Sequence, residues 1–283
     1  MSKKIIFVAD FFSNEINGGG ELNNDEFISL VKQRGHEIFP VKSSLLTIDI
    51  VKKFADCHYI FGNFLALSPS VYQYILENNI KYSIYEHDHK YLIARDPSKY
   101  ENHVAPKDHL TNVEFYKKAV AIFCQSKLHQ ETVQKNLNLD TIHNLSGNLW
   151  SLESLSLLRR NSTKDKKKIV SIWNSSNPIK NTAKAVAYCK IKKIPYELLG
   201  PLPYEDFLDA MGKNNSFLFF PETMETLCRV VVEARMMNVK TMTNGHLGAT
   251  SEEWFSLSGL DLVDLMENKR DEIPIMVLEA LGV

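Results

Sequence analysis

A strand, a turn and a helix follow one another between residues 216 and 243, and this unit restricts the folds open to the chain. Residues 216–220 (SFLFF) form an apolar run short enough for a buried strand, and it stops at Pro221, which has no N–H to donate. From Leu227 to Met237 apolar residues recur at three- and four-residue spacing, which predicts a helix with one buried face. Residues 239–243 predict the next strand. Strands that alternate with helices form parallel sheets, so we expect an α/β protein.

The turn between this strand and this helix is predicted to bind an anion. Thr226 is placed to cap the helix, whose first N–H groups lack intrahelical partners and lie at the positive end of the helix dipole. Glu225 precedes the helix and Glu233 lies about two turns along it, so both acids are expected to frame one pocket. The alternative is that Glu225 is a solvated turn residue and that Glu233 pairs with Arg229 on the same helix face.

Size and composition limit the remaining possibilities. A chain of 283 residues with 44% hydrophobic content can hold two domains with cores of their own. The 33 basic and 34 acidic residues nearly cancel, so bulk charge does not favour a polyanion. The four cysteines are scattered without a C-x-x-C pair, which suggests neither a zinc site nor a disulfide framework. With no signal-peptide core and no apolar segment of about 18 residues, we expect a cytoplasmic protein without a membrane span.

The amino-terminal half alternates in the same way. Residues 5–9 are apolar, the cluster Gly18-Gly19-Gly20 follows, and a helical stretch ends at Gly35. This order is the first βα unit of a doubly wound sheet, in which the glycines form a loop that a ligand can approach; a flexible surface loop is the alternative. Further strands are predicted at residues 38–41, 59–61, 82–85 and 119–124, and further helices at residues 50–54 and 71–77.

A charged segment follows the strand at residues 82–85. His87 and His89 flank Asp88, but successive residues of an extended segment point to opposite sides, so the three side chains are not expected to bind one metal ion. A satisfied surface cluster is the alternative. Farther on, residues 95–114 form a long polar connection of the type that often carries an acceptor site.

In the carboxyl-terminal half, residues 151–168 are polar and are predicted to be a linker. Their lysine-rich end, residues 164–168, is interpreted as a solvated hinge rather than a nucleic-acid contact, because its flanks are neutral. A strand, a turn and a helix are predicted from residue 169 to residue 190, with Lys180 at the start of that helix. Residues 260–283 are predicted to be helical, with a break at Pro274.

These motifs together resemble glycosyltransferase family 4 of the GT-B fold. Members commonly carry G-G-x-E after the first strand, a histidine after a later strand, a lysine after the first strand of the second domain, and a segment like E-G-F-G-x-x-x-x-E-A. The resemblance implies two Rossmann-like domains that face each other across a cleft. The expected bounds are 1–150 for the acceptor-side domain, 151–168 for the linker, 169–262 for the nucleotide-sugar domain and 263–283 for a helical tail packing back on the first domain.

The resemblance also implies an activity and the residues that carry it. A retaining, metal-independent transferase would move a sugar from a nucleotide diphosphate sugar to a hydroxyl acceptor, with no cofactor. Glu225 would hold sugar hydroxyls, Glu233 the ribose, Lys180 the diphosphate and His87 the sugar from the other domain. The expected catalytic residues are Glu225, His87 and Lys180, and the expected nucleotide-sugar site comprises Gly19, Gly20, Lys180, Gly200, Glu225, Thr226, Leu227, Cys228 and Glu233, with no metal ligand.

Two departures from the family pattern keep other functions open. Asn181 stands where glycine is usual, and no arginine occupies the turn before Lys180, where the family has the second cation of its diphosphate clamp. The alternatives are a sugar-nucleotide epimerase of the same fold, a non-catalytic sugar-nucleotide binding module, and a compact bacteriophage-type transferase acting on hydroxylated DNA bases in an infected host cell. The acceptor, a glycan, a small molecule or a modified base, is left open.

Overall fold

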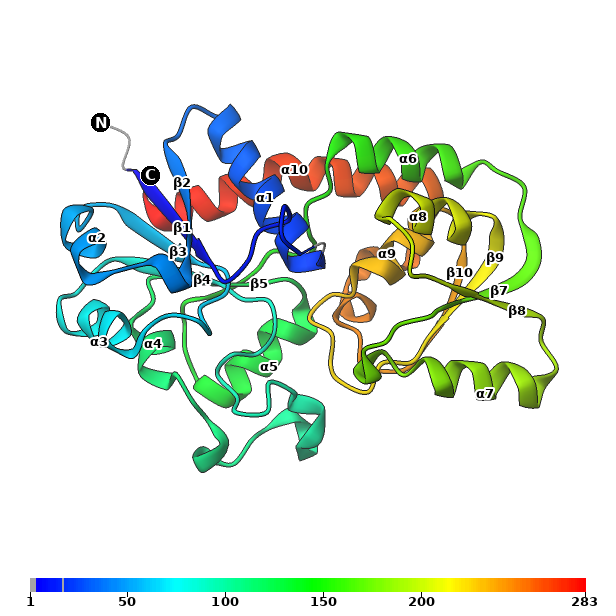
Figure 1. Ribbon diagram of the computed structural model, residues 1–283, viewed down its shortest axis with the longest axis horizontal. Helices are drawn as coiled ribbons and strands as arrows, with labels where there is room; N and C mark the ends of the chain where they lie inside the picture. The colour runs from blue at the N-terminus through cyan, green and yellow to red at the C-terminus, as the bar shows by residue number, and fades with distance from the viewer. Residues whose placement is uncertain (1–3, 17) are drawn as a thin grey trace. The chain divides into compact units, whose positions relative to one another are not determined.

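The computed structural model describes residues 4–16 and 18–283, and its chain divides into two compact units. Unit 1 comprises Met1–Leu149 with Lys269–Val283, and unit 2 comprises Trp150–Asn268. Each unit is built around a parallel β-sheet of its own with helices on both faces (Figure 1). The α/β class predicted from the alternating strands and helices is therefore confirmed.

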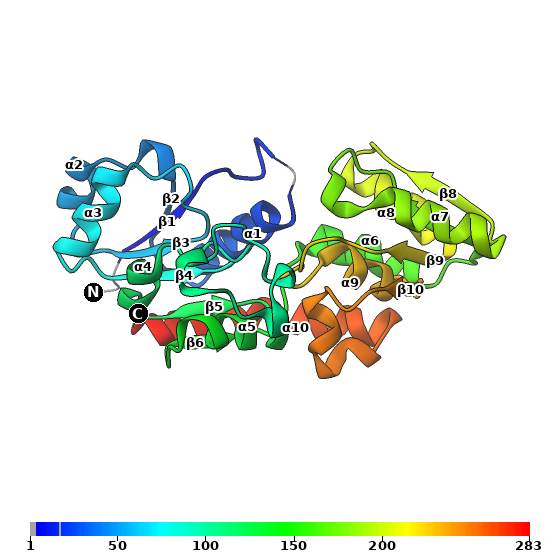
Figure 2. The same ribbon diagram turned by 90° about the horizontal axis from the view of Figure 1, so that it is seen from below.

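Unit 1 holds a six-stranded parallel sheet in the order β2-β1-β3-β4-β5-β6. All five residues of β1 are buried, because one face of the sheet packs on α1 and the end of α10 while the other packs on α2 to α5 (Figure 2). The strands are β1 (Ile5–Ala9), β2 (Ile38–Lys42), β3 (His58–Phe61), β4 (Tyr82–Tyr85), β5 (Ile122–Cys124) and β6 (Ile142–Asn144). The helices are α1 (Gly19–Gln33), α2 (Ile48–Lys53), α3 (Pro69–Glu77), α4 (Val113–Lys118) and α5 (Lys127–Leu137).

Unit 2 holds a four-stranded parallel sheet in the order β10-β9-β7-β8. Helices α6, α8, α9 and the first half of α10 cover one face with the larger core, and α7 covers the other face. The strands are β7 (Lys167–Trp173), β8 (Tyr196–Leu199), β9 (Asn214–Phe219) and β10 (Lys240–Thr243). The helices are α6 (Leu152–Ser162), α7 (Thr182–Lys192), α8 (Tyr204–Gly212), α9 (Arg229–Met236) and α10 (Gly259–Leu281).

Local sequence signals set several of these element ends. Gly35, with φ of 84°, follows α1 in the left-handed conformation that glycine adopts without steric cost. The side chains of Thr47, Ser68 and Ser126 accept backbone N–H bonds at the starts of α2, α3 and α5.

The segment predicted to be a linker, residues 151–168, is instead folded into unit 2. Helix α6 begins at Leu152 and buries Leu155, Leu157 and Leu158 in the larger core. The segment looks polar because its apolar residues are few, but their helical spacing places them on one face. Its last residues open β7, so the second domain starts near Trp150 rather than at residue 169.

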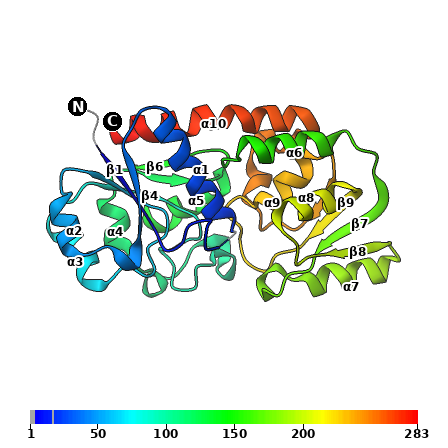
Figure 3. The ribbon, with the colours of Figure 1, turned by 45° about the horizontal axis from the view of Figure 1, so that its top comes forward.

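Two further expectations were wrong in detail. Gly19 and Gly20 lie in the first turn of α1 rather than in a loop before it. Pro274 lies inside α10, which runs without a break from Gly259 to Leu281. The first half of α10 packs along α6, where Arg159 pairs with Asp264 at 2.6 Å, and its second half belongs to unit 1 (Figure 3).

No helix among residues 4–16 and 18–283 is both long enough and apolar enough to cross a bilayer. Over the same residues, His, Cys, Asp and Glu side chains form no group of three or more that is arranged to hold a metal ion.

Candidate functional site

Lys180 and Glu225 meet at the carboxyl edge of the sheet in unit 2. Lys180 ends a short 3-10 helix, Pro178–Lys180, that follows β7, and its Nζ donates to Glu225 Oε1 at 2.6 Å. The ammonium also lies 5.6 Å from the ring centre of Trp173, the last residue of β7. Both charged side chains keep about a fifth of their surface exposed, at 19% and 20%. The pair is thus held in place and is still accessible to a ligand.

The charge state of Lys180 follows from two opposing effects. Burial by itself would lower the pKa of the ammonium, but the Glu225 carboxylate favours the charged form, and the net result is a raised pKa. Lys180 therefore carries a positive charge at neutral pH.

The segment from Glu225 to Cys228 is not helical, and helix α9 starts only after it. The Glu225 N–H donates to the His246 carbonyl at 2.8 Å, and the Ala249 N–H donates to the Leu227 carbonyl at 3.0 Å. Cys228 then turns the chain into α9 with φ of 80° and ψ of 75°. The capping role expected of Thr226 is wrong, because the backbone contacts with residues 246–249 delay the start of α9 and the residue before the helix is Cys228.

Cys228 occupies a position at which the family pattern has a glycine. The segment E-G-F-G places a glycine at this position, and the left-handed conformation observed here is one that glycine adopts freely. A buried cysteine takes this conformation at a cost of about 1 kcal/mol or more. The backbone at the start of α9 thus has the shape that the pattern implies, although the residue differs.

Glu233 is buried inside unit 2, where two side chains donate hydrogen bonds to its carboxylate. Its Oε1 accepts from Trp150 Nε1 at 2.9 Å and from Tyr204 Oη at 2.7 Å, and Arg229 Nε lies 3.7 Å away. The residue is only 3% exposed. Glu225 and Glu233 therefore occupy different surroundings: one faces the sheet edge beside Lys180, while the other stabilises the packing of α9 against Trp150.

Gly200 follows β8 at the same carboxyl edge of the sheet. The Asn174 N–H donates to the Leu199 carbonyl at 2.8 Å, so Gly200 lies beside the end of β7. With φ of 110°, Gly200 has a backbone conformation that other residues rarely adopt. The structure thus brings Lys180, Gly200, Glu225, Thr226, Leu227 and Cys228 to one edge of one sheet.

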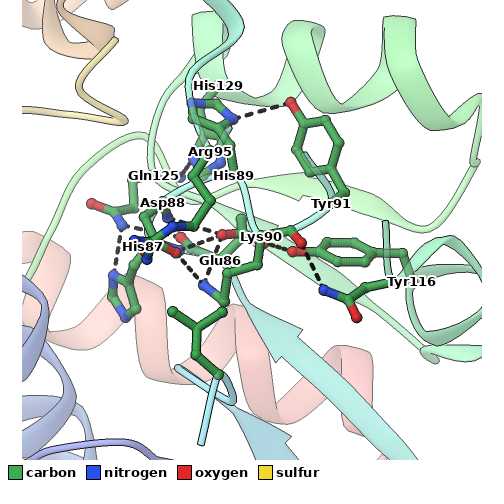
Figure 4. Close-up of polar contacts among 12 residues, drawn as sticks. Glu86, His87, Asp88, His89, Lys90, Tyr91, Arg95, Tyr116, Gln125 and His129 are labelled. Carbon is green, nitrogen blue, oxygen red and sulfur yellow. Dashed lines mark hydrogen bonds and ion pairs between the residues drawn. The ribbon is translucent and has the colours of Figure 1, made fainter. Parts of the chain in front are cut away.

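In unit 1 a buried ion pair organises the loop that carries His87. Glu86 and Lys90 are fully buried, and Lys90 Nζ donates to Glu86 Oε1 at 2.9 Å (Figure 4). Glu86 Oε1 also accepts the N–H groups of His87 and Asp88, at 3.0 and 2.9 Å, and the Tyr116 hydroxyl donates to Oε2. With its partners in place this pair fixes the loop, whereas either charge alone would be costly to bury.

Asp88 is the acid of this loop nearest to solvent, and cations satisfy both of its oxygens. Lys90 Nζ donates to Oδ1 at 2.7 Å and Arg95 Nη1 donates to Oδ2 at 3.0 Å. Burial raises the pKa of the Asp88 carboxyl, but Lys90 and then Arg95 lower it further, and the net shift is downward. Asp88 is therefore ionised at neutral pH.

Both ring nitrogens of His87 are used within unit 1. Gln125 Nε2 donates to the Glu86 carbonyl at 3.0 Å, which fixes the orientation of the amide, and it also donates to His87 Nδ1 at 2.7 Å. His87 Nε2 therefore carries the proton and donates to Asn24 Oδ1 at 2.7 Å. A hydrogen bond from His87 to a sugar, as the family resemblance implies, requires the contact with Asn24 or Gln125 to open.

The predicted glycines differ in their relation to His87. A Cβ on Gly20 would lie 3.5 Å from Cγ of the His87 ring, so the first turn of α1 lies directly against that ring. Gly19 is exposed on the same turn. The structure thus brings Gly20 and His87 together in unit 1, whereas the other predicted residues belong to unit 2.

Sequence reasoning missed the residues that hold these side chains in place. Asn24 and Gln125 bind His87, Glu86 and Lys90 fix its loop, and Trp150 and Tyr204 bind Glu233. One signal was present: Gln125 follows β5 as Glu86 follows β4, and β4 pairs with β5 in parallel. Because parallel neighbours end at the same edge of a sheet, the proximity of Gln125 to Glu86 was predictable. The burial of a charged pair carried no such signal.

Comparisons with known proteins were made at the level of sequence and of structure. No family model matches the chain, and no curated protein matches it in sequence. Among solved structures, Anabaena HepE in complex with UDP and glucose has a TM-score of 0.53 at 14% identity, covering 88% of this chain and 82% of its own. An alpha-glucosyltransferase in complex with UDP and a 13-mer DNA containing a HMU base has a TM-score of 0.50 at 12% identity, covering 97% and 91%.

A third structure is an epimerase rather than a transferase. UDP-GlcNAc 2-epimerase of Methanocaldococcus jannaschii, in complex with UDP-GlcNAc and UDP, has a TM-score of 0.53 at 10% identity and covers 99% of both chains. At such identities a structural match establishes the fold. The chain has the GT-B fold predicted from its sequence, a fold it shares with glycosyltransferases, and membership of glycosyltransferase family 4 stays a prediction.

Proposed function

We propose that this protein is a glycosyltransferase that moves a sugar from a nucleotide diphosphate sugar to a hydroxyl acceptor. The observation that carries the proposal is the Lys180–Glu225 pair, which lies partly exposed at the carboxyl edge of the unit 2 sheet. In open α/β sheets ligands bind at this edge. A lysine poised there matches the charge of a diphosphate, and an acid beside it matches the hydroxyls of a sugar.

The chemistry assigned to the pair is electrostatic. A diphosphate that enters the site accepts hydrogen bonds from Lys180, and the start of α9 adds the positive end of a helix dipole. As the bond to the sugar breaks, negative charge grows on the leaving diphosphate, and the fixed cation stabilises it in the transition state. Glu225, released from Lys180 when the diphosphate binds, holds sugar hydroxyls throughout. The acceptor oxygen bonds to the anomeric carbon, and the proton of the acceptor hydroxyl passes to the leaving diphosphate. We propose that this arrangement transfers the sugar with retention and without an essential metal.

The proposed donor is a uridine diphosphate sugar. HepE, the alpha-glucosyltransferase and the epimerase were each solved in complex with UDP. Gly200, at the end of β8, is the position that the family resemblance assigns to the base. The cysteines support a reducing compartment such as the cytoplasm, because all four are buried and unpaired.

The test is calorimetric binding of UDP-, GDP-, ADP- and TDP-sugars to the wild type and to Lys180→Ala. Loss of a charged hydrogen bond costs about 1.5–3 kcal/mol, so we expect the Kd for the UDP-sugar to weaken by about 10- to 150-fold. Lys184→Ala is the matched control, since Lys184 is an exposed lysine in the first turns of α7. Equal affinity of Lys180→Ala and wild type would contradict the proposal.

Glu233 needs a separate design because its removal damages the fold. Glu233→Gln keeps an oxygen for Trp150 and Tyr204, whereas Glu233→Ala leaves both donors buried without a partner. If Glu233 also binds ribose, Glu233→Gln weakens UDP-sugar binding at unchanged thermal stability. Unchanged binding would limit Glu233 to a structural role.

Product analysis separates transfer from the alternatives. With a UDP-sugar bound, the wild type is incubated with glycan, small-molecule and hydroxylated-DNA acceptors, with and without EDTA. Transfer that persists in EDTA supports the metal-independent reaction, and the anomeric configuration of the product tests retention. Isomerised sugar without an acceptor would favour the epimerase, and tight binding without turnover would favour a binding module.

A further inference from the structure

Every strand of the unit 2 sheet begins beside an exposed lysine. Lys167 and Lys168 open β7, Lys213 precedes β9 and Lys240 opens β10. Lys192 and Lys193 end α7, where the chain turns toward β8 (Figure 1). Because all four strands are parallel, their starts lie along the same edge. We call these six lysines the basic edge.

Backbone contacts place parts of the basic edge side by side. The Lys167 N–H donates to the Lys213 carbonyl at 2.8 Å. The Val170 N–H donates to the Pro195 carbonyl at 3.0 Å, so β7 lies beside the segment that leads from Lys193 into β8. With strands about 4.8 Å apart, the four starts span about 14 Å. The basic edge is opposite the carboxyl edge that holds Lys180 and Glu225.

The acids near the basic edge do not neutralise it. None of the six lysine side chains has an ion pair within the described part of the chain. Asp165 is exposed just before β7, and Glu197 of β8 is engaged by Asn214 Nδ2 at 2.6 Å. Lys166 differs from its neighbours, because its ammonium turns inward to the carbonyls of Asn161 and Gly212. The six outward lysines thus form a concentrated positive surface on a chain whose net charge is −1.

We propose that the basic edge docks on a membrane surface rich in anionic phospholipids. An exposed apolar side chain among the lysines favours this partner over a nucleic acid, because a bilayer can take up an apolar residue and a phosphate backbone cannot. Ile191 stands among them with 78% of its surface exposed. Apolar contact combined with several lysines is the pattern of a protein that lies on a charged bilayer. Docking of this kind leaves the opposite edge of the sheet free for its ligand.

The experiment measures cosedimentation of the full chain with vesicles. One set is pure phosphatidylcholine, and the other contains about one third phosphatidylserine. We expect binding to the anionic vesicles alone, and loss of that binding as salt is raised. The variant Lys168→Glu/Lys192→Glu/Lys213→Glu should bind about 100-fold more weakly, and Ile191→Ser should bind severalfold more weakly.

A matched control changes net charge equally at another place. Lys81, Lys107 and Lys135 are exposed lysines of unit 1, and their triple change to Glu should leave vesicle binding within twofold of wild type. Circular dichroism confirms that both triple variants are folded. The proposal is overturned if wild type does not bind anionic vesicles, if both triple variants lose binding alike, or if duplex DNA binds through the same lysines at lower concentration than vesicles do. Nucleotide-sugar binding is not used as a readout, so failure here leaves the proposed function untouched.

Discussion

His89 shows how the setting of one side chain makes the whole fold sensitive to acid. Its Nδ1 contacts the Tyr91 hydroxyl at 3.1 Å, whereas its Nε2 is buried without a hydrogen-bond partner, and its ring packs against that of His129 at 4.8 Å. Burial lowers the pKa of His89 to about 3, although Asp88 and Asp96 act to raise it. The pKa of His129 is also lowered by burial. Both imidazoles are therefore neutral in the folded protein at any pH near neutrality.

The pH dependence of stability follows from this shift. Below about pH 6.5 the unfolded chain binds a proton at His89 that the folded chain does not, so folding becomes less favourable as the pH falls. Between pH 7 and pH 5 this residue alone should remove about 2 kcal/mol from the free energy of unfolding. His89→Asn lacks the titrating group, and asparagine tolerates the φ of 57° at this position.

We expect the free energy of unfolding of His89→Asn to fall by about 2 kcal/mol less than that of wild type between these two pH values. Urea denaturation followed by circular dichroism at pH 7 and pH 5 measures the difference. The same substitution at His109, which is exposed, serves as the control. An identical fall in all three proteins would contradict the assignment.

Single residues also mark the limit of prediction from sequence. The spacing of Glu225 and Glu233 predicted correctly that one precedes α9 and the other lies on it. It could not distinguish their roles, because the partners Lys180, Trp150 and Tyr204 come from distant parts of the chain. His87 is similar, since its position after β4 was predicted while its contacts with Asn24 and Gln125 depend on how α1 and β5 pack.

At the scale of elements, the start of α9 offers a test of backbone strain. Cys228→Gly removes a left-handed cost of about 1–2 kcal/mol and loses about 1 kcal/mol of apolar burial, so stability should change by less than about 1 kcal/mol. Cys228→Val places a branched Cβ in the same conformation and should destabilise the protein by about 2 kcal/mol or more. The midpoints of urea unfolding measure both changes.

Cys189 provides the comparison, because it is buried in α7 within a regular helix. There glycine loses both helix propensity and apolar burial and should cost about 2 kcal/mol, whereas valine should cost less than about 1.5 kcal/mol, the reverse of the order at Cys228. If glycine and valine ranked the same way at both positions, strain at Cys228 would not be the cause.

Helices and strands were predictable where the local sequence determines them. They were not predictable where contacts with distant residues determine where they begin and end. Strands β1, β4 and β10 were predicted within a residue or two, because each is a short apolar or β-branched run between polar turns. Helix α6 was missed, since its three core leucines lie in a polar segment. The start of α9 was placed too early because the pairing of Glu225 and Leu227 with residues 246–249 cannot be read from local sequence.

At the scale of the whole molecule, unit 1 is built from both ends of the chain. The sequence suggested this only through a helical tail expected to pack back on the first domain. Unit 1 is completed by Lys269–Val283, which follow unit 2 in the chain. Ile273, Val277 and Leu278 are buried in the core that α1 forms with its face of the unit 1 sheet. Arg270 Nη1 pairs with Glu26 Oε1 of α1 at 2.5 Å. The amino-terminal residues of unit 1 thus lack part of their core until the end of the chain is in place.

Deleting Lys269–Val283 should therefore unfold unit 1 while leaving unit 2 folded. Burial of an aliphatic side chain contributes about 1.5–3 kcal/mol, so losing Ile273, Val277, Leu278 and Leu281 removes about 6 kcal/mol or more, comparable with the whole stability of a domain. Hydrogen exchange should become fast in β1 and β4 and stay slow in β7 and β9. A chain lacking only Gly282 and Val283 is the control and should exchange as wild type does. Slow exchange in β1 after the long deletion would mean that residues 4–149 are stable by themselves, and that the end of α10 is an accessory to the core of unit 1 rather than a part that it needs.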